Sequence, residues 1–402
     1  MRLKRTVLAA AMAAFAGAAG AQVSDGVVKI GVMNDMSSLY ADIGGPGSVV
    51  AAKMAVEDYL KSTKSKLKVE VVSADHQNKP DVGSQIARQW YDVDKVDAIV
   101  DVPTSSVALA VSDVTRQKGK AFLITGAATS DLTGKACSPN SVHWLYDTWM
   151  LAHGTGSAIV KTGGDTWFFI TADYAFGLAL ERDTEAVVLQ SGGKVLGRVR
   201  APLNTQDFSS FLLQAQASKA KIIGLANAGG DTINSIKQAA EFGVVRSGQN
   251  LAGLLVFLTD VHGLGLDKAQ GLIFTEAWYW DLNEASRAWT KRFVALNGGK
   301  YPSMDHAGVY AAVLHYLKAV DAAKTDDGTK VVAEMKRLPT DDPLFGKGRV
   351  RQDGRTIHPA YLFEVKKPSE SKYPYDYYKL RATIPAEEAF RPEKDGGCPL
   401  VK

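Results

Sequence analysis

The sequence predicts an α/β protein with two lobes, each built on a doubly wound parallel β-sheet. From residue 27 onward, short β-rich runs alternate with longer helical runs, which is the pattern of parallel βαβ units. The alternation runs through one series and then starts again near Thr148. The chain has 402 residues, 46% of them hydrophobic, which is enough for two lobes with large cores.

The first series contains four expected strands separated by three expected helices. The strands are runs rich in Val, Ile and Leu at residues 27–33, 68–74, 98–102 and 121–125. The longer helical runs lie at residues 47–60, 80–91 and 106–118. We expect these helices to cover both faces of the sheet, because parallel strands need crossover connections.

The second series repeats this arrangement, beginning with a helix. Its helices are expected at residues 148–161, 175–190, 208–217 and 232–242. Its strands are expected at residues 167–171, 194–199, 222–226 and 251–258. Two lobes of similar size follow.

The sequence after Leu272 is too short and too heterogeneous for a third lobe. It has helical runs at 286–296 and 307–323 and β-like runs at 360–365 and 375–380. We expect it to cross back and complete both lobes, with several connections that form a hinge. The expected first lobe is 26–145 plus 280–338, the second is 146–279 plus 339–390, and 391–402 is a C-terminal tail.

The N-terminus has the features of a secretory signal peptide. Residues 1–5 are basic, 6–16 form an apolar run, and Ala19-Gly20-Ala21 has the small residues of a cleavage site. We expect residues 1–21 to be removed and the mature protein to be periplasmic. The alternative, a membrane anchor, is disfavoured because the apolar run is shorter than the roughly 20 residues that span a bilayer.

Two cysteines, Cys137 and Cys398, are present. In an oxidising compartment an even number of cysteines favours a disulfide, although two separate buried thiols would also fit the sequence. No CxxC motif supports a zinc site or dithiol chemistry.

The sequence lacks the motifs of the common enzyme and cofactor sites. It has no G-x-G-x-x-G after the first strand, no P-loop, no G-x-S-x-G and no H-E-x-x-H. The seven histidines are scattered without metal-ligand spacing. The net charge of +4 falls to about +1 without the three basic residues of the leader, so bulk charge does not support nucleic-acid binding. We therefore expect no cofactor, no metal and no nucleic-acid partner.

Three loops after expected first-lobe strands are rich in hydroxyl groups and small residues. They lie at residues 37–40, 103–106 and 125–129. Ligands of parallel α/β sheets sit at this edge. Ser105 and Ser106 stand at the start of a helix, where free N–H groups favour a carboxylate. Plain helix capping by these serines is the alternative.

With these loops, the sequence resembles the periplasmic substrate-binding proteins of branched-chain amino acid ABC transporters. The likeness runs from about Val28 to at least Tyr316 and rests on motifs in order and spacing. These are Val28-Lys29-Ile30-Gly31-Val32-Met33, the helix around 51–60, Ser112-Asp113 and Gly119, Gly126-Ala127-Ala128-Thr129, Asp173-Tyr174-Ala175-Phe176-Gly177, Lys237-Gln238-Ala239 and Phe242-Gly243.

The resemblance implies a type I periplasmic binding protein fold, a Venus flytrap whose lobes are joined by three crossing segments. A monomer of this kind clamps a small ligand as its lobes close and then docks on permease subunits with cytoplasmic ATPases, without chemistry of its own. By position, the resemblance assigns Ser105 and the Ala127 to Thr129 segment to the ligand carboxylate. It assigns Tyr40 from the first lobe and Tyr174 from the second to covering the ligand, although plain packing is the alternative for both tyrosines.

The sequence departs from the amino-acid binders of this family in the second lobe. The loop around Gly229 lacks their aromatic residue, which predicts more room, and Asp260 is the nearest candidate for the acid that holds an ammonium group. Trp278 and Trp280 could offer rings to the cleft or pack beside the hinge. We expect an aromatic carboxylic acid as the ligand. The alternatives are a branched-chain or other amino acid, a role in sensing through a receptor, and an exported hydrolase.

Overall fold

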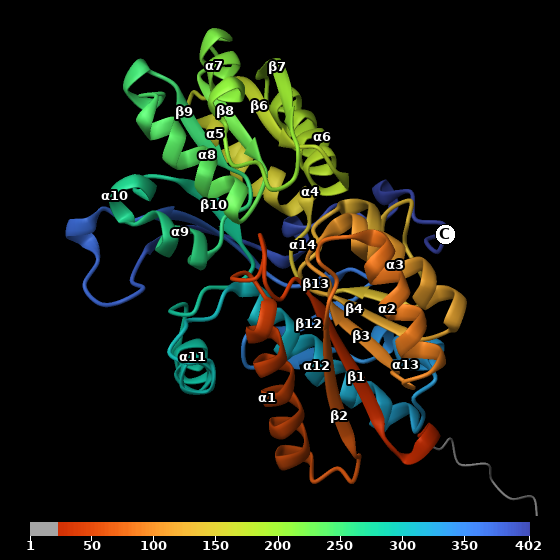
Figure 1. The fold of residues 1–402 in the computed structure, drawn as a ribbon. Helices are drawn as coiled ribbons and strands as arrows, with labels where there is room; N and C mark the ends of the chain where they lie inside the picture. The colour runs from red at the N-terminus through yellow and green to blue at the C-terminus, as the bar shows by residue number, and fades with distance from the viewer. Residues whose placement is uncertain (1–22) are drawn as a thin grey trace, which may run out of the picture.

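The computed structural model describes residues 23–402 and shows two α/β lobes (Figure 1). The predicted signal peptide at residues 1–21 lies outside the described residues. Within them, no helix is both long and apolar enough to cross a membrane.

The first lobe contains a five-stranded parallel sheet in the order β2-β1-β3-β4-β5. The strands are β1 Val28–Asn34, β2 Val69–Asp75, β3 Ala98–Asp101, β4 Ala121–Ile124 and β5 Ser141–His143. Helices α2 Pro80–Asp92 and α3 Ser105–Lys118 pack together, and α1 Gly45–Thr63 packs on α12 Met304–Ala323, which contacts α13 Gly328–Arg337. The helices form two separate apolar clusters with the sheet between them, so the lobe is doubly wound as predicted.

The second lobe has a parallel sheet in the order β7-β6-β8-β9. Its strands are β6 Thr166–Ala172, β7 Lys194–Ala201, β8 Ile222–Ala226 and β9 Asn250–Gly253. Its main helices are α5 Ser157–Lys161, α6 Ala175–Gln190, α7 Ser209–Ala217 and α8 Gly230–Glu241. Shorter helices lie at α4 Thr148–Leu151, α9 Leu258–Leu264 and α10 Leu266–Ala269, and a π-helical turn at Ala152–Gly156 joins α4 to α5.

The C-terminal third completes both lobes. An antiparallel sheet of β10 Ile273–Glu276, β14 Ala360–Val365 and β15 Tyr378–Ile384 extends the second lobe, and α11 Glu284–Leu296 packs on α1 of the first. A small sheet of β11 Thr340–Asp342, β12 Gly346–Val350 and β13 Thr356–Ile357 contacts α12 and α13. The last helix is α14 Ala386–Ala389.

The structure places residues 340–357 on the first lobe, whereas the sequence assigned 339–390 to the second. A bridge between His143 and Arg355 joins β13 to the edge of the first sheet. The chain therefore crosses between the lobes at residues 144–147, 277–283 and 358–359, which confirms the three-segment hinge. The chain also crosses back later than we expected from its local pattern.

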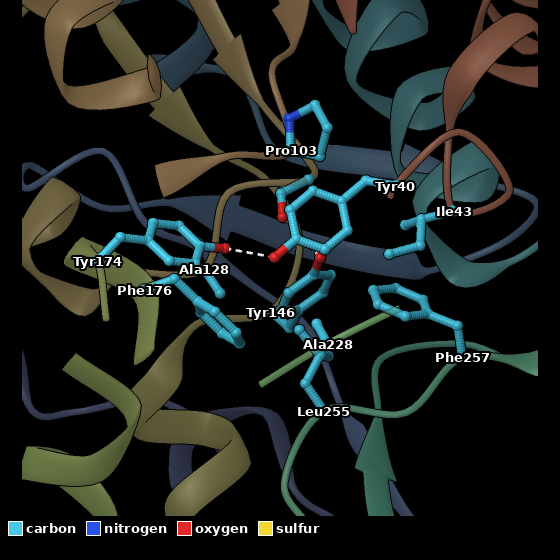
Figure 2. A pocket seen from close by; sticks show the side chains of 11 residues that line it. Tyr40, Ile43, Pro103, Ala128, Tyr146, Tyr174, Phe176, Ala228, Leu255 and Phe257 are labelled. Atoms are coloured by element: carbon cyan, nitrogen blue, oxygen red, sulfur yellow. Dashed lines mark hydrogen bonds between the residues drawn. The ribbon is translucent and has the colours of Figure 1, made fainter. Parts of the chain in front are cut away.

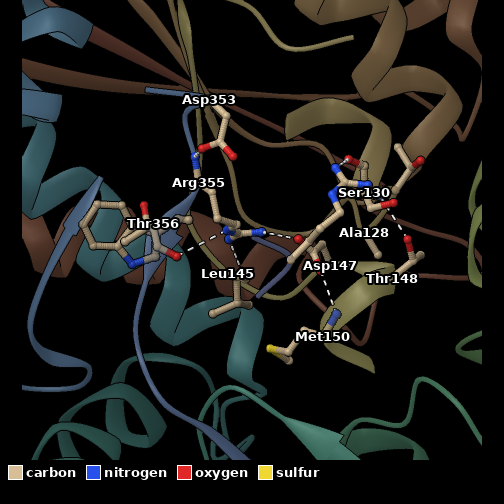
Figure 3. A network of polar contacts seen from close by, with 12 residues as sticks. Ala128, Ser130, Leu145, Asp147, Thr148, Met150, Asp353, Arg355 and Thr356 are labelled. Carbon is tan, nitrogen blue, oxygen red and sulfur yellow. Dashed lines mark hydrogen bonds and ion pairs between the residues drawn. The ribbon is translucent and has the colours of Figure 1, made fainter. Parts of the chain in front are cut away.

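A buried arginine ties the first-lobe segment 340–357 to the crossing segment at residues 144–147 (Figure 3). The Arg355 guanidinium is fully buried, donates to the carbonyl of Leu145, and lies 3.3 Å from the Asp147 carboxylate. Burial lowers the pKa of Arg355 to about 10, but it stays charged beside Asp147. Asp147 also accepts a hydrogen bond from the Met150 amide at 2.8 Å, which caps α4. The ion pair thus fixes where the second lobe begins.

The C-terminal tail is attached to the first lobe. Cys137 and Cys398 form a disulfide, as predicted, with a Cα–Cα distance of 5.7 Å. Arg391 donates to the Ser130 carbonyl at 3.0 Å. The tail therefore braces the first lobe.

Candidate functional site

A small cavity of about 10 Å³ lies between the lobes, at the carboxyl ends of the parallel strands (Figure 2). Each wall comes from the loops that follow the strands of one lobe, the position where such sheets bind ligands. First-lobe loops supply Tyr40, Ile43, Pro103, Gly126 and Ala128, second-lobe loops supply Tyr174, Phe176, Ala228, Leu255 and Phe257, and a crossing segment supplies Tyr146. Among these described residues none is charged, so the cavity is apolar apart from tyrosine hydroxyls and backbone groups.

Contacts across the cleft show that the lobes are closed. The hydroxyl oxygens of Tyr40 and Tyr174 are 2.6 Å apart, which joins the first-lobe loop to the start of α6. A second contact between the lobes is made by Ser130, which donates to Asp183 at 2.7 Å. Burial raises the pKa of both tyrosines, so both hydroxyls are neutral. One hydroxyl donates to the other, and the second keeps a proton that it can donate to a ligand.

The loop that carries Tyr40 is held by Asp35. The Asp35 carboxylate accepts hydrogen bonds from the Tyr40 amide at 2.8 Å, the Ser38 amide at 2.9 Å and the Asn78 side chain at 2.7 Å. Burial alone would raise the pKa of Asp35, but these hydrogen bonds hold it below its ordinary value. The loop is therefore built around a stable carboxylate, and Tyr40 is fixed at the cavity wall.

Gly229 faces Tyr40 across the cleft. Its φ of +56° and its surroundings both require glycine, because a Cβ atom there would lie 2.8 Å from the Leu39 carbonyl oxygen and 3.0 Å from the Tyr40 ring. We expected this loop to leave extra room for the ligand. In the closed structure the space beside Gly229 is occupied by Tyr40 and the backbone of Leu39 instead.

The expected carboxylate-binding residues lie beside the cavity. Ser105 is the first residue of α3, and its hydroxyl oxygen accepts hydrogen bonds from the amides of Ala128 at 3.3 Å and Thr129 at 3.2 Å. No side chain caps α3, so its first N–H groups remain available to an anion. Ala128 lines the cavity, whereas Ser105, Ser106, Ala127 and Thr129 do not. Thr129 itself accepts from the Asp131 amide at 3.4 Å.

The turn between β3 and α3 is strained. Asp101 has a φ of +86° and Val102 a φ of +61°, which is rare for any residue other than glycine and rarest for a β-branched one. This turn presents Pro103 to the cavity. Backbone strain of this kind concentrates at ligand-binding positions.

A buried pair of carboxyl groups, missed by sequence reasoning, lies below this turn. Asp101 and Asp305 are both fully buried, and Asp101 accepts hydrogen bonds from Asn34 and from Thr125 at 3.3 Å. Burial raises the pKa of both groups, and the Asp101 charge raises that of Asp305 further. The pair therefore keeps a proton that isolated carboxyl groups would have lost. A Cβ on Gly126 would lie 2.8 Å from an Asp101 oxygen, so the pair lies directly under the cavity wall.

The other three second-lobe and hinge candidates do not line the cavity. The Asp260 carboxylate accepts from the Phe257 amide at 2.9 Å, and burial raises the pKa of Asp260 to about 7. Trp278 donates to the Ser286 hydroxyl at 2.9 Å, and Trp280 donates to a backbone carbonyl at 3.0 Å. The two tryptophans pack beside the hinge, which is the alternative that the sequence left open.

Five side chains of the cavity were not singled out from the sequence, namely Ile43, Tyr146, Phe176, Leu255 and Phe257. Phe176 follows Tyr174 by two residues within the Asp173 to Gly177 motif, so that motif could have identified it. Tyr146, Leu255 and Phe257 carried no such signal, because they lie in apolar runs that resemble core strands.

Comparison with known proteins identifies the family. A family model described as periplasmic binding protein matches residues 27–372. The chain belongs to this family of periplasmic binding proteins. A crystal structure of a periplasmic binding protein from Burkholderia mallei is 52% identical, with a TM-score of 0.90, and the match covers 94% of this chain and 100% of that one.

Two further relatives give the transporter type. A branched chain amino acid ABC transporter periplasmic ligand-binding protein from Burkholderia xenovorans LB400 is 40% identical, with a TM-score of 0.82 and coverage of 93% of this chain and 100% of that chain. The Leu/Ile/Val-binding protein homolog 6 of Brucella melitensis biotype 1 is 26% identical over 379 residues, which is 90% of this chain and 93% of the relative. The protein is thus a periplasmic solute-binding protein of the ABC-transporter type.

A more distant likeness concerns the fold alone. A solute-binding protein from R. palustris, solved in complex with 4-hydroxybenzoate, is 22% identical, with a TM-score of 0.78 and coverage of 90% of this chain and 98% of that chain.

Proposed function

We propose that this binding protein captures a small aromatic carboxylic acid between its closing lobes and delivers it to a membrane permease driven by ATPase subunits. The observation that carries the proposal is the cavity itself, which has ring-bearing, uncharged walls and lies beside the uncapped start of α3. Its free volume of about 10 Å³ in this closed form holds no more than about one water molecule, so the lobes have to open to admit a ligand. Rings in both walls suit an aromatic ligand, which the lobes would enclose as they close.

The two ends of the cavity suit the two ends of such a ligand. A carboxylate is favoured near α3, where free N–H groups and the positive end of the helix dipole are directed at the site. An aromatic ring is favoured among Tyr146, Phe176 and Phe257, which offer ring faces and edges. The Tyr40–Tyr174 pair can donate one hydrogen bond to a polar substituent.

An amino acid is the second candidate, and one observation favours it. The Asp231 side chain is buried near both cleft tyrosines, and its Oδ1 atom has no hydrogen-bond partner within the described part of the chain. Burial raises the pKa of Asp231 to about 7. To pair with the ammonium group of an amino acid, the Asp231 carboxyl group would first have to lose its proton, which costs binding free energy. The originally expected partner, Asp260, already holds the Phe257 amide. These costs favour the aromatic acid.

The test is a thermal-shift screen followed by calorimetry with benzoate, 4-hydroxybenzoate, 3-phenylpropanoate, leucine and valine. A ligand that binds only the folded protein raises its melting temperature. We expect the aromatic acids to raise it and leucine and valine to leave it unchanged. A rise with leucine or valine alone would establish the second candidate, and a response to neither class would refute both.

A matched pair of variants ties any binding to this cavity. Tyr174→Ala should weaken binding of the active acid, because it removes a wall of the second lobe and the link to Tyr40. Tyr361→Ala is the control, since Tyr361 is another partly buried second-lobe tyrosine that does not line the cavity. Equal affinities in the two variants would show that the ligand binds elsewhere.

Two further measurements distinguish transport from hydrolysis and from sensing. The cavity walls offer no nucleophile paired with a base among the described residues, so an ester of the active acid should be recovered unchanged after incubation. Uptake of the labelled acid should stop when the permease that receives it from this protein is deleted. Continued uptake would point to a sensing role.

A further inference from the structure

A hairpin loop of the second lobe reaches across to the first lobe at the edge of the cleft. The loop joins β14 to β15 and spans residues 366–377, and Figure 1 shows it as the blue loop beside α9 and α10. Near its end, Tyr375 has a φ of +62°, an unfavourable conformation for a bulky residue. Tyr279 and Trp280 hold it there by donating to its carbonyl oxygen at 2.7 and 3.0 Å. Strain that is held so firmly points to a function for the Tyr375 side chain.

The ring of Tyr375 is stacked between two other rings. The Tyr301 ring lies 4.1 Å away at an interplanar angle of 14°, and the His262 ring lies 4.5 Å away at 16°. A near-parallel stack of three rings brings attraction beyond the burial of apolar area. His262 is on α9 of the second lobe, so Tyr375 and His262 belong to the same lobe.

Tyr301 belongs to the first lobe. It lies in the loop before α12, where Ser303 donates to the Ile43 carbonyl at 2.5 Å and His306 lies 2.8 Å from the Gly44 carbonyl oxygen. Ile43 itself lines the cavity. The stack therefore spans the two lobes next to the ligand site, in addition to the hydroxyl contact between the two cleft tyrosines.

We propose that Tyr301, Tyr375 and His262 form an interlobe latch, a ring stack that is complete only when the lobes are closed and that slows their opening. Rotation of the lobes about the three crossing segments would carry Tyr301 away from Tyr375, whereas Tyr375 and His262 would move together. The contact with Tyr301 is thus made only in the closed state, the condition for a residue to shift the balance between open and closed forms. This proposal rests on the proposed function only in that the protein captures its ligand by closing its lobes. It does not depend on which ligand is bound.

The test measures lobe closure directly, without a ligand. Cysteines are introduced at Lys61 in the first lobe and Lys219 in the second, and both are spin-labelled. Pulsed electron paramagnetic resonance then reports the distance between the two labels, and so between the lobes. The native cysteines are joined in a disulfide and do not react. We expect Tyr301→Ala to lower the closed-to-open ratio by about 3- to 10-fold, in line with the loss of one ring stack.

Two control variants separate a latch from a general packing defect. Tyr301→Phe keeps the ring and should retain the wild-type distribution of distances. Lys372→Ala changes an exposed side chain of the same hairpin outside the stack, and it should also match wild type. The two controls should keep the wild-type urea midpoint, whereas Tyr301→Ala should lower it slightly, because it also removes the edge contact of Tyr301 with the Trp280 ring at 5.0 Å.

The same variants give a kinetic readout with 4-hydroxybenzoate as the probe. Tyr301→Ala should raise the dissociation rate about 3- to 10-fold and leave the association rate unchanged, since the latch forms after the ligand enters. An unchanged distance distribution for Tyr301→Ala, or an equal change in Lys372→Ala, would overturn the latch. If 4-hydroxybenzoate does not bind, only the ligand proposal fails, because the distance measurement stands without it.

Discussion

Replacing Ser105 by alanine tests how the site loop is built. The Ser105 hydroxyl oxygen is the acceptor for two buried amides, those of Ala128 at 3.3 Å and Thr129 at 3.2 Å. In the alanine variant both amides lose their partner while they remain away from water. Each such loss costs roughly 1 to 3 kcal/mol, and because both bonds are long we expect a total of about 2 to 4 kcal/mol for Ser105→Ala.

Urea unfolding and hydrogen exchange measure this cost. The unfolding midpoint should fall with little change in the slope, and the Ala128 and Thr129 amides should exchange faster than in wild type. Ser106→Ala, one residue further along α3, is the matched control and should change the unfolding free energy by less than about 0.5 kcal/mol. If Ser105→Ala unfolds at the wild-type urea concentration and both amides stay protected, the hydroxyl does not hold this loop.

Three further substitutions probe closure, protonation and the tail. Gly229→Ala should keep the lobes from closing and weaken ligand binding at least about 10-fold, because the new methyl group would collide with Tyr40 and strain the backbone; calorimetry and scattering would measure this. Asp305→Asn should flatten the pH dependence of unfolding. The contribution of this pair to the stability of the wild type falls as the pH rises above about 4, since folded Asp101 and Asp305 keep a proton that the unfolded chain releases. Cys398→Ser should lower the unfolding free energy by about 2 to 5 kcal/mol by freeing the tail.

Each of these expectations has an outcome that contradicts it. Normal compaction of Gly229→Ala with ligand would mean that the Gly229 loop does not approach Tyr40 in solution. Equal slopes of unfolding free energy against pH for Asp305→Asn and wild type, between pH 5 and 8, would show that the acid pair is ionised when folded. Unchanged protease resistance of the tail in Cys398→Ser would show that other contacts hold it.

The alternation of strands and helices could be predicted because each βαβ unit is encoded locally. Strands β1, β3, β4, β6 and β8 lie within a few residues of their predicted positions. The main miss is the predicted strand at 251–258, where β9 ends at Gly253 and α9 begins at Leu258. A continuous apolar run carries no period, so it fits a buried strand and a buried helix start equally well.

The C-terminal third illustrates a different limit. Residues 340–357 join the first lobe through the bridge between His143 and Arg355 and the contacts of β11 and β12 with the helices α12 and α13. Such pairing depends on which sheet edge is free in the folded protein. The sequence of a short β-like run carries no information about that edge. The pairing of Cys137 with Cys398 was favoured by an even cysteine count in an exported chain, but its geometry depends on the packed tail.

The sequence by itself determined the two α/β lobes, the family and the loops that meet at the cleft, because these follow from local hydrophobic patterns and from the rule that parallel strands end at a common edge. Only the tertiary structure decided which side chains meet. Tyr40 touches Tyr174 from 134 positions away, Asp305 lies under the β3 turn, and Tyr375 stacks on Tyr301. Contacts between such distant residues arise when two lobes pack and close, and no local pattern in the chain encodes that packing.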